Sequence, residues 1–190
     1  MIFFNPGFDT FLLSRGCALR GKTVKTLLLL RHAKSSWDDT SLSDFERPLN
    51  PRGMQTAPFI GELIAEKGWQ PDAILSSPAL RAEQTALLAK EAARLTTEIR
   101  FDEKIYEACQ FQLLEVLKGF SSPAGTILLV GHNPGMEGLL SLLTGEMHSI
   151  PTAALIKVSL NIDSWDQIER GSGKVEEFIK PKEQMNPTGA

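Results

Sequence analysis

The chain has 190 residues, of which 42% are apolar, and it carries a formal net charge of −3 at pH 7. This length and composition suit one domain with a sizeable core and leave too little for two. The slightly acidic balance, with lysines and arginines scattered along the chain, disfavours nucleic-acid binding. Because no stretch approaches the roughly 18 apolar residues of a membrane helix, we expect no membrane association either.

The first stretch of the chain, residues 1–24, contains "GCALRGKT", which matches the phosphate-loop pattern G-x-x-x-x-G-K-[ST]. Such a loop follows a buried strand and opens directly into a helix. Here Thr23 is followed almost at once by an apolar run of strand length, so an NTPase with magnesium-dependent nucleotide hydrolysis is the weaker interpretation. We interpret residues 1–24 as a non-catalytic extension.

The two cysteines, Cys17 and Cys109, lie far apart in the sequence and lack C-x-x-C spacing. Neither a disulfide framework nor a thiolate metal cage is indicated, which favours a reducing compartment. The chain's first apolar residues also lack the basic start of a secretory signal peptide. We therefore predict a cytoplasmic protein.

The next two patterns are a strand and a helix. The continuous apolar run at 26–30 predicts a strand that is buried on both faces. After a polar loop, residues 50–68 carry apolar side chains at helical spacing, with Pro58 tolerated early in the helix. Gly68 is expected to end this helix as its C-cap.

The segment 72–95 repeats this order. Its sequence "DAILSSPALRAEQTALLAKEAARL" predicts a short strand, a Ser-Ser-Pro corner and a helix. We expect Ser77 to cap this helix and Pro78 to be its first residue.

The order recurs once more at "GTILLVGHNPGMEGLLSLLTG", where a strand at 127–130 precedes a helix that begins near Pro134. The stretches "TAALIKVSL" and "KVEEFIKP" are further strand candidates. Strands that alternate with helices predict an α/β fold, a three-layer sandwich with a largely parallel central sheet.

Three of the predicted strand ends carry polar or charged side chains: "LLRHAKSS", "LSSPALRAEQT" and "LLVGHNPG". In parallel sheets, ligands bind outside the carboxyl ends of the strands, so Arg31, His32, Arg81 and His132 should converge. A guanidinium matches two phosphate oxygens at once, so the arginines can hold a phosphoryl group. A neutral imidazole can attack phosphorus, and His32 is our candidate nucleophile. His132 would stabilise the charge that develops on the phosphoryl oxygens.

These same residues carry a resemblance to a known family. The stretches "LLLLRHAKSSW", "SSPALRAEQTA" and "VGHNPGME" resemble the histidine phosphatase superfamily, and most closely its SixA-type phosphohistidine phosphatase branch. The resemblance covers residues 25–181, which we take as the phosphatase domain with residues 182–190 as a C-terminal tail. It implies a phosphoglycerate mutase-like fold.

The resemblance also implies an activity and a site. The reaction would be metal-independent hydrolysis of a phosphomonoester or phosphoramidate, without a cofactor, through a phosphohistidine intermediate on His32. Arg31, Arg81 and His132 would form the phosphate pocket, and Arg47 in "FERPLN" matches a further position near the phosphate. The branch often replaces the glycine of the usual RHG triplet, as Ala33 does here.

Several choices stay open at this stage. The general acid is Glu107 in "IYEACQ", Asp38 in "SSWDD" or neither, since a good leaving group needs little protonation. The substrate is a phosphohistidine-bearing protein, which we favour, or a small phosphorylated metabolite. The alternative to an enzyme is a non-catalytic module that binds phosphoryl groups. With only three histidines, two of them beside arginines, a metal site is not expected.

Overall fold

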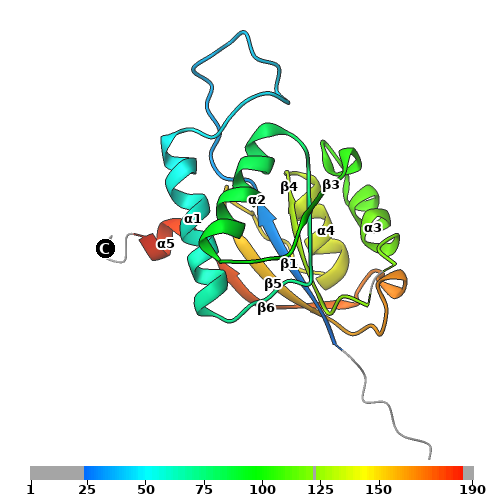
Figure 1. Cartoon of the computed structure of the whole chain (residues 1–190). Coiled ribbons are helices and arrows are strands. Elements are labelled where there is room, and N and C mark those ends of the chain that lie inside the picture. Colours follow the sequence, from blue (N-terminus) through cyan, green and yellow to red (C-terminus); the bar gives the residue numbers. More distant parts are fainter. Residues whose placement is uncertain (1–23, 122, 186–190) are drawn as a thin grey trace, which may run out of the picture.

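The computed structural model describes residues 24–121 and 123–185, so the "GCALRGKT" motif and the expected extension lie outside the described part. The elements are β1 (Lys25–Arg31), α1 (Pro51–Glu66), β2 (Ala73–Ser76), α2 (Leu80–Ala92), β3 (Ile99–Phe101), the 3-10 helix η1 (Glu103–Ile105), α3 (Gln110–Lys118), β4 (Thr126–Gly131), α4 (Gly135–Thr144), β5 (Leu155–Leu160), the 3-10 helix η2 (Trp165–Gln167), β6 (Gly173–Ile179) and α5 (Pro181–Met185). Figure 1 shows their arrangement.

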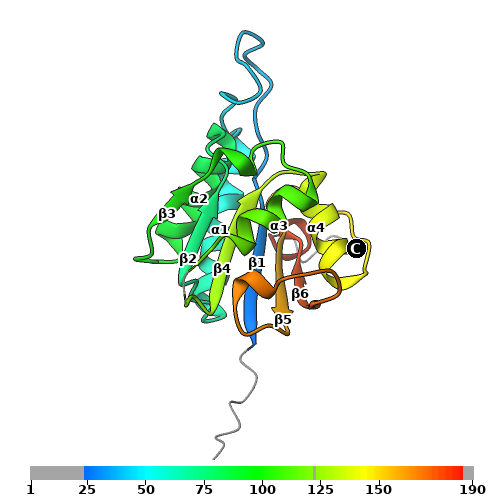
Figure 2. The same cartoon turned by 90° about the vertical axis from the view of Figure 1, so that its right-hand side faces the viewer.

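A central sheet separates two layers of helices, because its strands are apolar on both faces. In β1, Leu27 and Leu29 pack into the core formed with α3 and α4, whereas Leu28 and Leu30 pack into the core formed with α1 and α2. All four side chains are fully buried. Successive side chains of a strand point to opposite faces, so a continuous apolar run fills both cores. The three-layer α/β prediction is confirmed (Figures 1 and 2).

The sheet has the strand order β3-β2-β4-β1-β5-β6 in the described part of the chain. The pairs β2–β3, β2–β4 and β1–β4 are parallel, while β5 pairs with both β1 and β6 in antiparallel fashion. The expected largely parallel sheet is confirmed, with an antiparallel edge. Because β1, β2 and β4 are parallel neighbours, their carboxyl ends lie at one edge of the sheet.

The β1–α1 loop, residues 32–50, projects beyond this edge of the sheet in both views of the molecule (Figures 1 and 2). It closes on itself near its base, where Ser35 bridges to Leu49 and the Ser36 N–H donates to the Pro48 carbonyl at 2.9 Å. It is also tied to α2, since the Leu80 N–H donates to the Phe45 carbonyl at 3.0 Å. The loop therefore lies beside the ends of β1 and β2.

The helix boundaries agree with the sequence patterns except at α2. Pro58 lies inside α1 as predicted, and the C-cap is Lys67, one residue before the expected Gly68, which follows with a positive φ of 64°. The predicted start of α2, with Ser77 as its cap and Pro78 as its first residue, is wrong, because α2 begins at Leu80 with Ala79 at the N-cap position. The Ser77 hydroxyl accepts from the Ala79 N–H at 3.2 Å, but Ser77 lies two residues before the N-cap position and does not cap the helix.

Candidate active site

His32 follows the last residue of β1. Its N–H donates to the Gly131 carbonyl at 3.0 Å, and its own carbonyl accepts from the Ala153 N–H at 3.1 Å, so its backbone is fixed on both sides. The ring is buried, and Nδ1 lies 2.7 Å from the Ala33 carbonyl oxygen. A carbonyl can only accept, so in the neutral ring Nδ1 carries the proton and Nε2 has the lone pair.

The electrostatics of the site keep this ring neutral. Burial lowers the pKa of His32 to about 3, and the neighbouring His132, Arg81 and Arg31 act in the same direction. The hydrogen bond to Ala33 opposes this shift without cancelling it. Over the physiological pH range, His32 is therefore a neutral imidazole with a free lone pair on Nε2.

His132 follows the end of β4, which pairs with β1 in a register that sets Arg31 opposite Gly131. The register brings the two histidine rings to a centroid distance of 5.0 Å. His132 is also buried, and burial, followed by the charge of Arg81, lowers its pKa to about 4. The site thus holds two neutral imidazoles side by side.

Ser77, just beyond β2, fixes the ring of His132. Its hydroxyl lies 2.8 Å from His132 Nε2, and both residues are buried. His132 Nδ1 is buried and has no hydrogen-bond partner among the residues that the structure describes. The local sequence pattern predicts a helix cap at Ser77, whereas its contact with His132 arises from the pairing of β2 with β4.

Arg31, the last residue of β1, extends toward the segment before β5. Its Nη1 donates to the Ile150 carbonyl at 2.6 Å, and its Nε is buried without a partner in the described part of the chain. Glu137 holds this segment by accepting from the Ile150 N–H at 2.8 Å and from the Asn133 amide at 2.6 Å. Burial lowers the pKa of Arg31, and the charge of Glu137 opposes the shift.

Arg81, in the first turn of α2, and Arg47, in the β1–α1 loop, meet at Asp44. The Asp44 carboxylate accepts from Arg81 Nη2 at 2.8 Å through Oδ2, and from Arg47 Nη1 at 2.8 Å through Oδ1. Arg81 Nη1 also donates to the Asp44 backbone carbonyl. Both guanidinium groups are nearly buried, whereas the Asp44 side chain is 44% exposed. Sequence reasoning missed Asp44, although an acid three residues before Arg47 was a visible signal.

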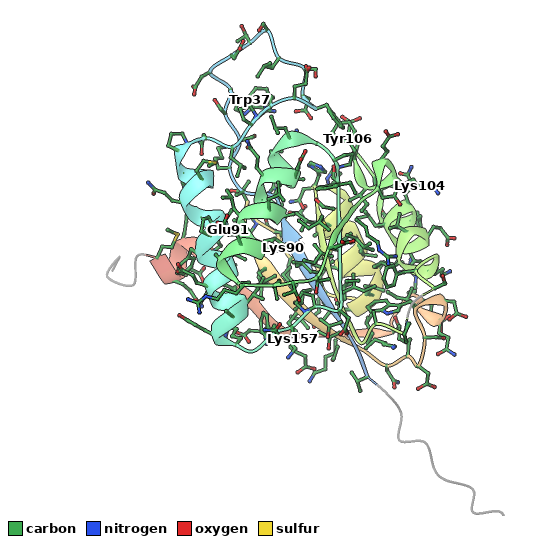
Figure 3. The ribbon with its side chains drawn as sticks, viewed as in Figure 1. Trp37, Lys90, Glu91, Lys104, Tyr106 and Lys157 are labelled. Carbon is green, nitrogen blue, oxygen red and sulfur yellow. The ribbon has the colours of Figure 1, made fainter. Side chains whose placement is uncertain are left out.

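Tyr106, which follows η1, packs against His132. Its ring meets the His132 ring edge-on at a centroid distance of 5.7 Å and the Phe45 ring at 5.1 Å. Its hydroxyl donates to Asp44 Oδ2 at 3.1 Å. Figure 3 shows Tyr106 at the same end of the molecule as Trp37 of the projecting loop. Tyr106 is thus a second residue of this site that the sequence patterns did not identify.

The two candidate acids lie at the periphery. Glu107 is exposed, directly follows Tyr106 and has a positive φ of 49°. Asp38 is exposed in the projecting loop, where it accepts from the Ser36 hydroxyl at 2.7 Å. Neither carboxylate has a hydrogen bond to either active-site histidine, so the structure does not bring them into the cluster that holds His32, His132, Arg31 and Arg81.

The remaining aromatic and histidine candidates have local contacts. Trp37 is 69% exposed and stacks on the Arg47 guanidinium, whose central carbon lies 3.1 Å from the ring centroid. Trp165 is buried and donates to the Ala124 carbonyl at 2.8 Å. His148 pairs with Glu146 at 2.7 Å.

No group of three or more histidine, cysteine or carboxylate side chains in the described residues is arranged to hold a metal ion. Cys109 is a free, exposed cysteine. None of the described helices is long and apolar enough to cross a membrane.

These features give the site one chemical character. The neutral His32 imidazole, with a free Nε2, lies beside the imidazole of His132. Arg31 at the end of β1 and Arg81 at the start of α2 supply two guanidinium groups. The buried, unpartnered N–H of Arg31 Nε and the positive charge of Arg81 favour the binding of a tetrahedral anion with several oxygens. The arrangement can hold a phosphoryl group against a nitrogen nucleophile.

Comparisons with known proteins agree with this character. A model of the histidine phosphatase superfamily (branch 1) matches residues 27–117. An uncharacterised chloroplastic protein of Arabidopsis thaliana is 33% identical over 172 residues, which cover 83% of this chain and 78% of the relative.

Solved structures share the fold over most of this chain. A SixA protein from Agrobacterium tumefaciens, provisionally named a phosphohistidine phosphatase, is 30% identical and gives a TM-score of 0.72 over 83% of this chain and 98% of its own. The protein histidine phosphatase SixA in complex with tungstate gives a TM-score of 0.73 at 21% identity, over 84% of this chain and 99% of its own. The chain therefore belongs to the histidine phosphatase superfamily, in its SixA-type branch.

Proposed function

We propose that this protein is a metal-independent phosphatase that works through a covalent phosphohistidine on His32. One observation carries the proposal: His32 Nδ1 is held at the Ala33 carbonyl, which leaves a neutral Nε2 lone pair beside His132 and the buried arginines. A nucleophile needs this lone pair at neutral pH, and the lowered pKa of His32 supplies it. Membership of the superfamily supports phosphatase activity in the same direction.

The reaction has two steps. In the first, His32 Nε2 attacks phosphorus, a new N–P bond forms, and the bond between phosphorus and the leaving group breaks with its electron pair on the leaving group. In the second, water attacks the phosphorus of phospho-His32, and the N–P bond breaks. Orthophosphate leaves, and the imidazole returns to its neutral form.

The other residues stabilise the charge of the transferring group. We assign Arg31, Arg81 and His132 to the phosphoryl oxygens, because each presents an N–H donor or positive charge near His32. Arg47 is the fourth member of the proposed pocket, and its three nitrogen positions already contact Ser36, Asp44 and Ser35, so only its remaining N–H groups can reach a ligand.

Glu107 is our proposed general acid for leaving groups that need a proton. Its exposed position beside Tyr106 would let it reach a leaving group at the rim of the site. Asp38 is the second candidate. Phosphohistidine has an imidazole leaving group, which departs with less help from an acid than an alkoxide does, so it suits a site whose histidines have no carboxylate partner.

We favour phosphohistidine on a protein as the substrate, with a small phosphomonoester as the other choice. The provisional name of the Agrobacterium protein, to which this chain is 30% identical, supports this preference. A cytoplasmic location is a proposal that rests on the cysteine pattern. The related Arabidopsis protein is named chloroplastic.

The phosphoenzyme can be trapped. Brief incubation with a ³²P-labelled substrate, followed by an alkaline quench, should leave label on His32 of the native chain, because phosphohistidine withstands alkali and is lost in acid. The His32→Ala variant should take up none, while His148→Ala, which changes an outlying histidine, should label as the native chain does. Label that persists in His32→Ala, or that survives acid, contradicts the proposed intermediate.

A further inference from the structure

Asp44 joins three separate parts of the site through one carboxylate. Arg47 of the projecting loop donates to Oδ1, and Arg81 of α2 and Tyr106 after η1 both donate to Oδ2. The Asp44 backbone carbonyl accepts a further bond from Arg81. No sequence pattern assigned a role to this residue, and the proposed reaction does not use it.

The two arginines need such a partner. Their guanidinium groups are almost fully buried, and both converge on the same carboxylate. Two like charges this close repel one another in a poorly solvated site. A carboxylate between them lowers this repulsion and, by accepting from both forks, fixes the direction of each guanidinium plane.

Asp44 is an ionised group and not a general acid. Partial burial acts to raise its pKa, but the charge of Arg81 and the hydrogen bonds from Arg81, Tyr106 and Arg47 outweigh that effect and hold the pKa below its ordinary value. The carboxylate therefore has no proton to give at neutral pH.

We propose that Asp44 is a positioning residue, which orients the guanidinium groups of Arg47 and Arg81 toward the oxygens of the bound phosphoryl group. The inference rests on the proposed function, since it assigns Arg81 and Arg47 to phosphate binding. In the opposite role, the Asp44 carboxylate would compete with the phosphoryl group for the N–H donors of the two arginines. The two roles predict changes of opposite sign when the carboxylate is removed.

Binding of tungstate, a tetrahedral oxyanion that mimics phosphate, distinguishes the two roles of Asp44 without requiring catalysis. Isothermal titration of tungstate into the native chain, Asp44→Ala and the near-isosteric Asp44→Asn should give a dissociation constant raised at least about tenfold in both variants. Asp39→Asn is the matched control, because Asp39 is an exposed acid of the same loop whose carboxylate accepts hydrogen bonds from Ser41 and, within the described residues, has none to the arginines. Its affinity should equal that of the native chain.

An unchanged or tighter affinity in both Asp44 variants overturns the proposal, and tighter binding identifies the competing carboxylate. Because tungstate binding requires no catalysis, the result holds even if the native chain hydrolyses none of the substrates offered. A chain that binds tungstate and has no phosphatase activity contradicts the proposed function alone.

A double-mutant cycle tests whether Asp44 acts through an arginine. If it does, the loss in tungstate affinity of Asp44→Ala/Arg47→Ala is smaller than the product of the two single losses. Losses that multiply in full contradict the proposed positioning of Arg47, and the same cycle with Arg81→Ala tests Arg81. With p-nitrophenyl phosphate, the same Asp44 variants should lose kcat/KM by a similar factor while their melting temperatures stay within a few degrees of the native value, which a merely structural role would not produce.

Discussion

The imidazole rings of His32 and His132 lie 5.0 Å apart, and this distance follows from the pairing of two buried strands. Each histidine follows the last residue of its strand, and β1 and β4 are parallel neighbours in register. The chemistry of the site therefore depends on strand register, because a shift by one residue would turn one of the rings toward the opposite face of the sheet. The apolar alternation that fixes this register also builds both cores.

Arg81→Lys should lower kcat/KM by about 10- to 100-fold. A lysine keeps the charge but loses the planar fork that can bond two phosphoryl oxygens while it also contacts Asp44. Steady-state kinetics with p-nitrophenyl phosphate measures the effect. Arg52→Lys, an exposed position of α1, is the control and should match the native chain. Equal activity of Arg81→Lys and the native chain would remove Arg81 from the phosphate pocket.

Ser77→Ala should lower kcat by about tenfold and leave the fold intact. The change removes the partner of His132 Nε2, so the ring loses the contact that fixes its orientation. Ser76→Ala is a matched control, because it also deletes a buried hydroxyl of the same strand end, one that donates to the Ser77 carbonyl and not to His132. If both variants lose activity equally, the effect comes from the strand end and not from His132.

Acid should destabilise the native chain through its two buried histidines, His32 and His132. The pKa of His32 falls from an ordinary 6.5 to about 3 in the folded protein, so below the ordinary value the unfolded chain binds a proton that the folded chain does not. The free energy of unfolding therefore falls as the pH drops from about 6.5 toward about 3, and between pH 7 and pH 5 His32 contributes about 2 kcal/mol of this loss.

Urea denaturation at these two pH values checks this sign. His32→Gln should lose about 2 kcal/mol less than the native chain between pH 7 and pH 5, because glutamine does not titrate. The control His148→Gln removes a half-buried histidine outside the site and should show nearly the native loss. An equal acid loss in His32→Gln and the native chain contradicts the buried, neutral state of His32.

The sequence predicts the parts of the site that strand ends carry. A buried apolar strand ends where polar residues begin, so Arg31, His32 and His132 could be placed from local patterns alone, and the parallel sheet brings them together. Arg81 could be placed for the same reason, since a helix starts just after β2.

The contacts that depend on the projecting loop could not be predicted. Asp44 meets Arg81 and Tyr106 across long stretches of chain, and no local periodicity encodes the fold of a polar loop. The start of α2 was misplaced because Ser77 satisfies the usual cap pattern, while in the fold its hydroxyl bonds His132 and the Ala79 N–H. The antiparallel edge depends on β5 and β6, whose patterns show strands but not their direction.

Phosphate release in excess EDTA tests whether His32 is the nucleophile of a metal-independent phosphatase. The native chain, His32→Ala and the control His148→Ala are compared on two substrates. A phosphohistidine-bearing protein and p-nitrophenyl phosphate are assayed separately. We expect activity that EDTA does not change, that falls by several orders of magnitude in His32→Ala and that persists in His148→Ala. Activity that EDTA abolishes, or that His32→Ala retains, would contradict it, and a native chain that binds phosphate without releasing any would be a phosphoryl-binding module instead.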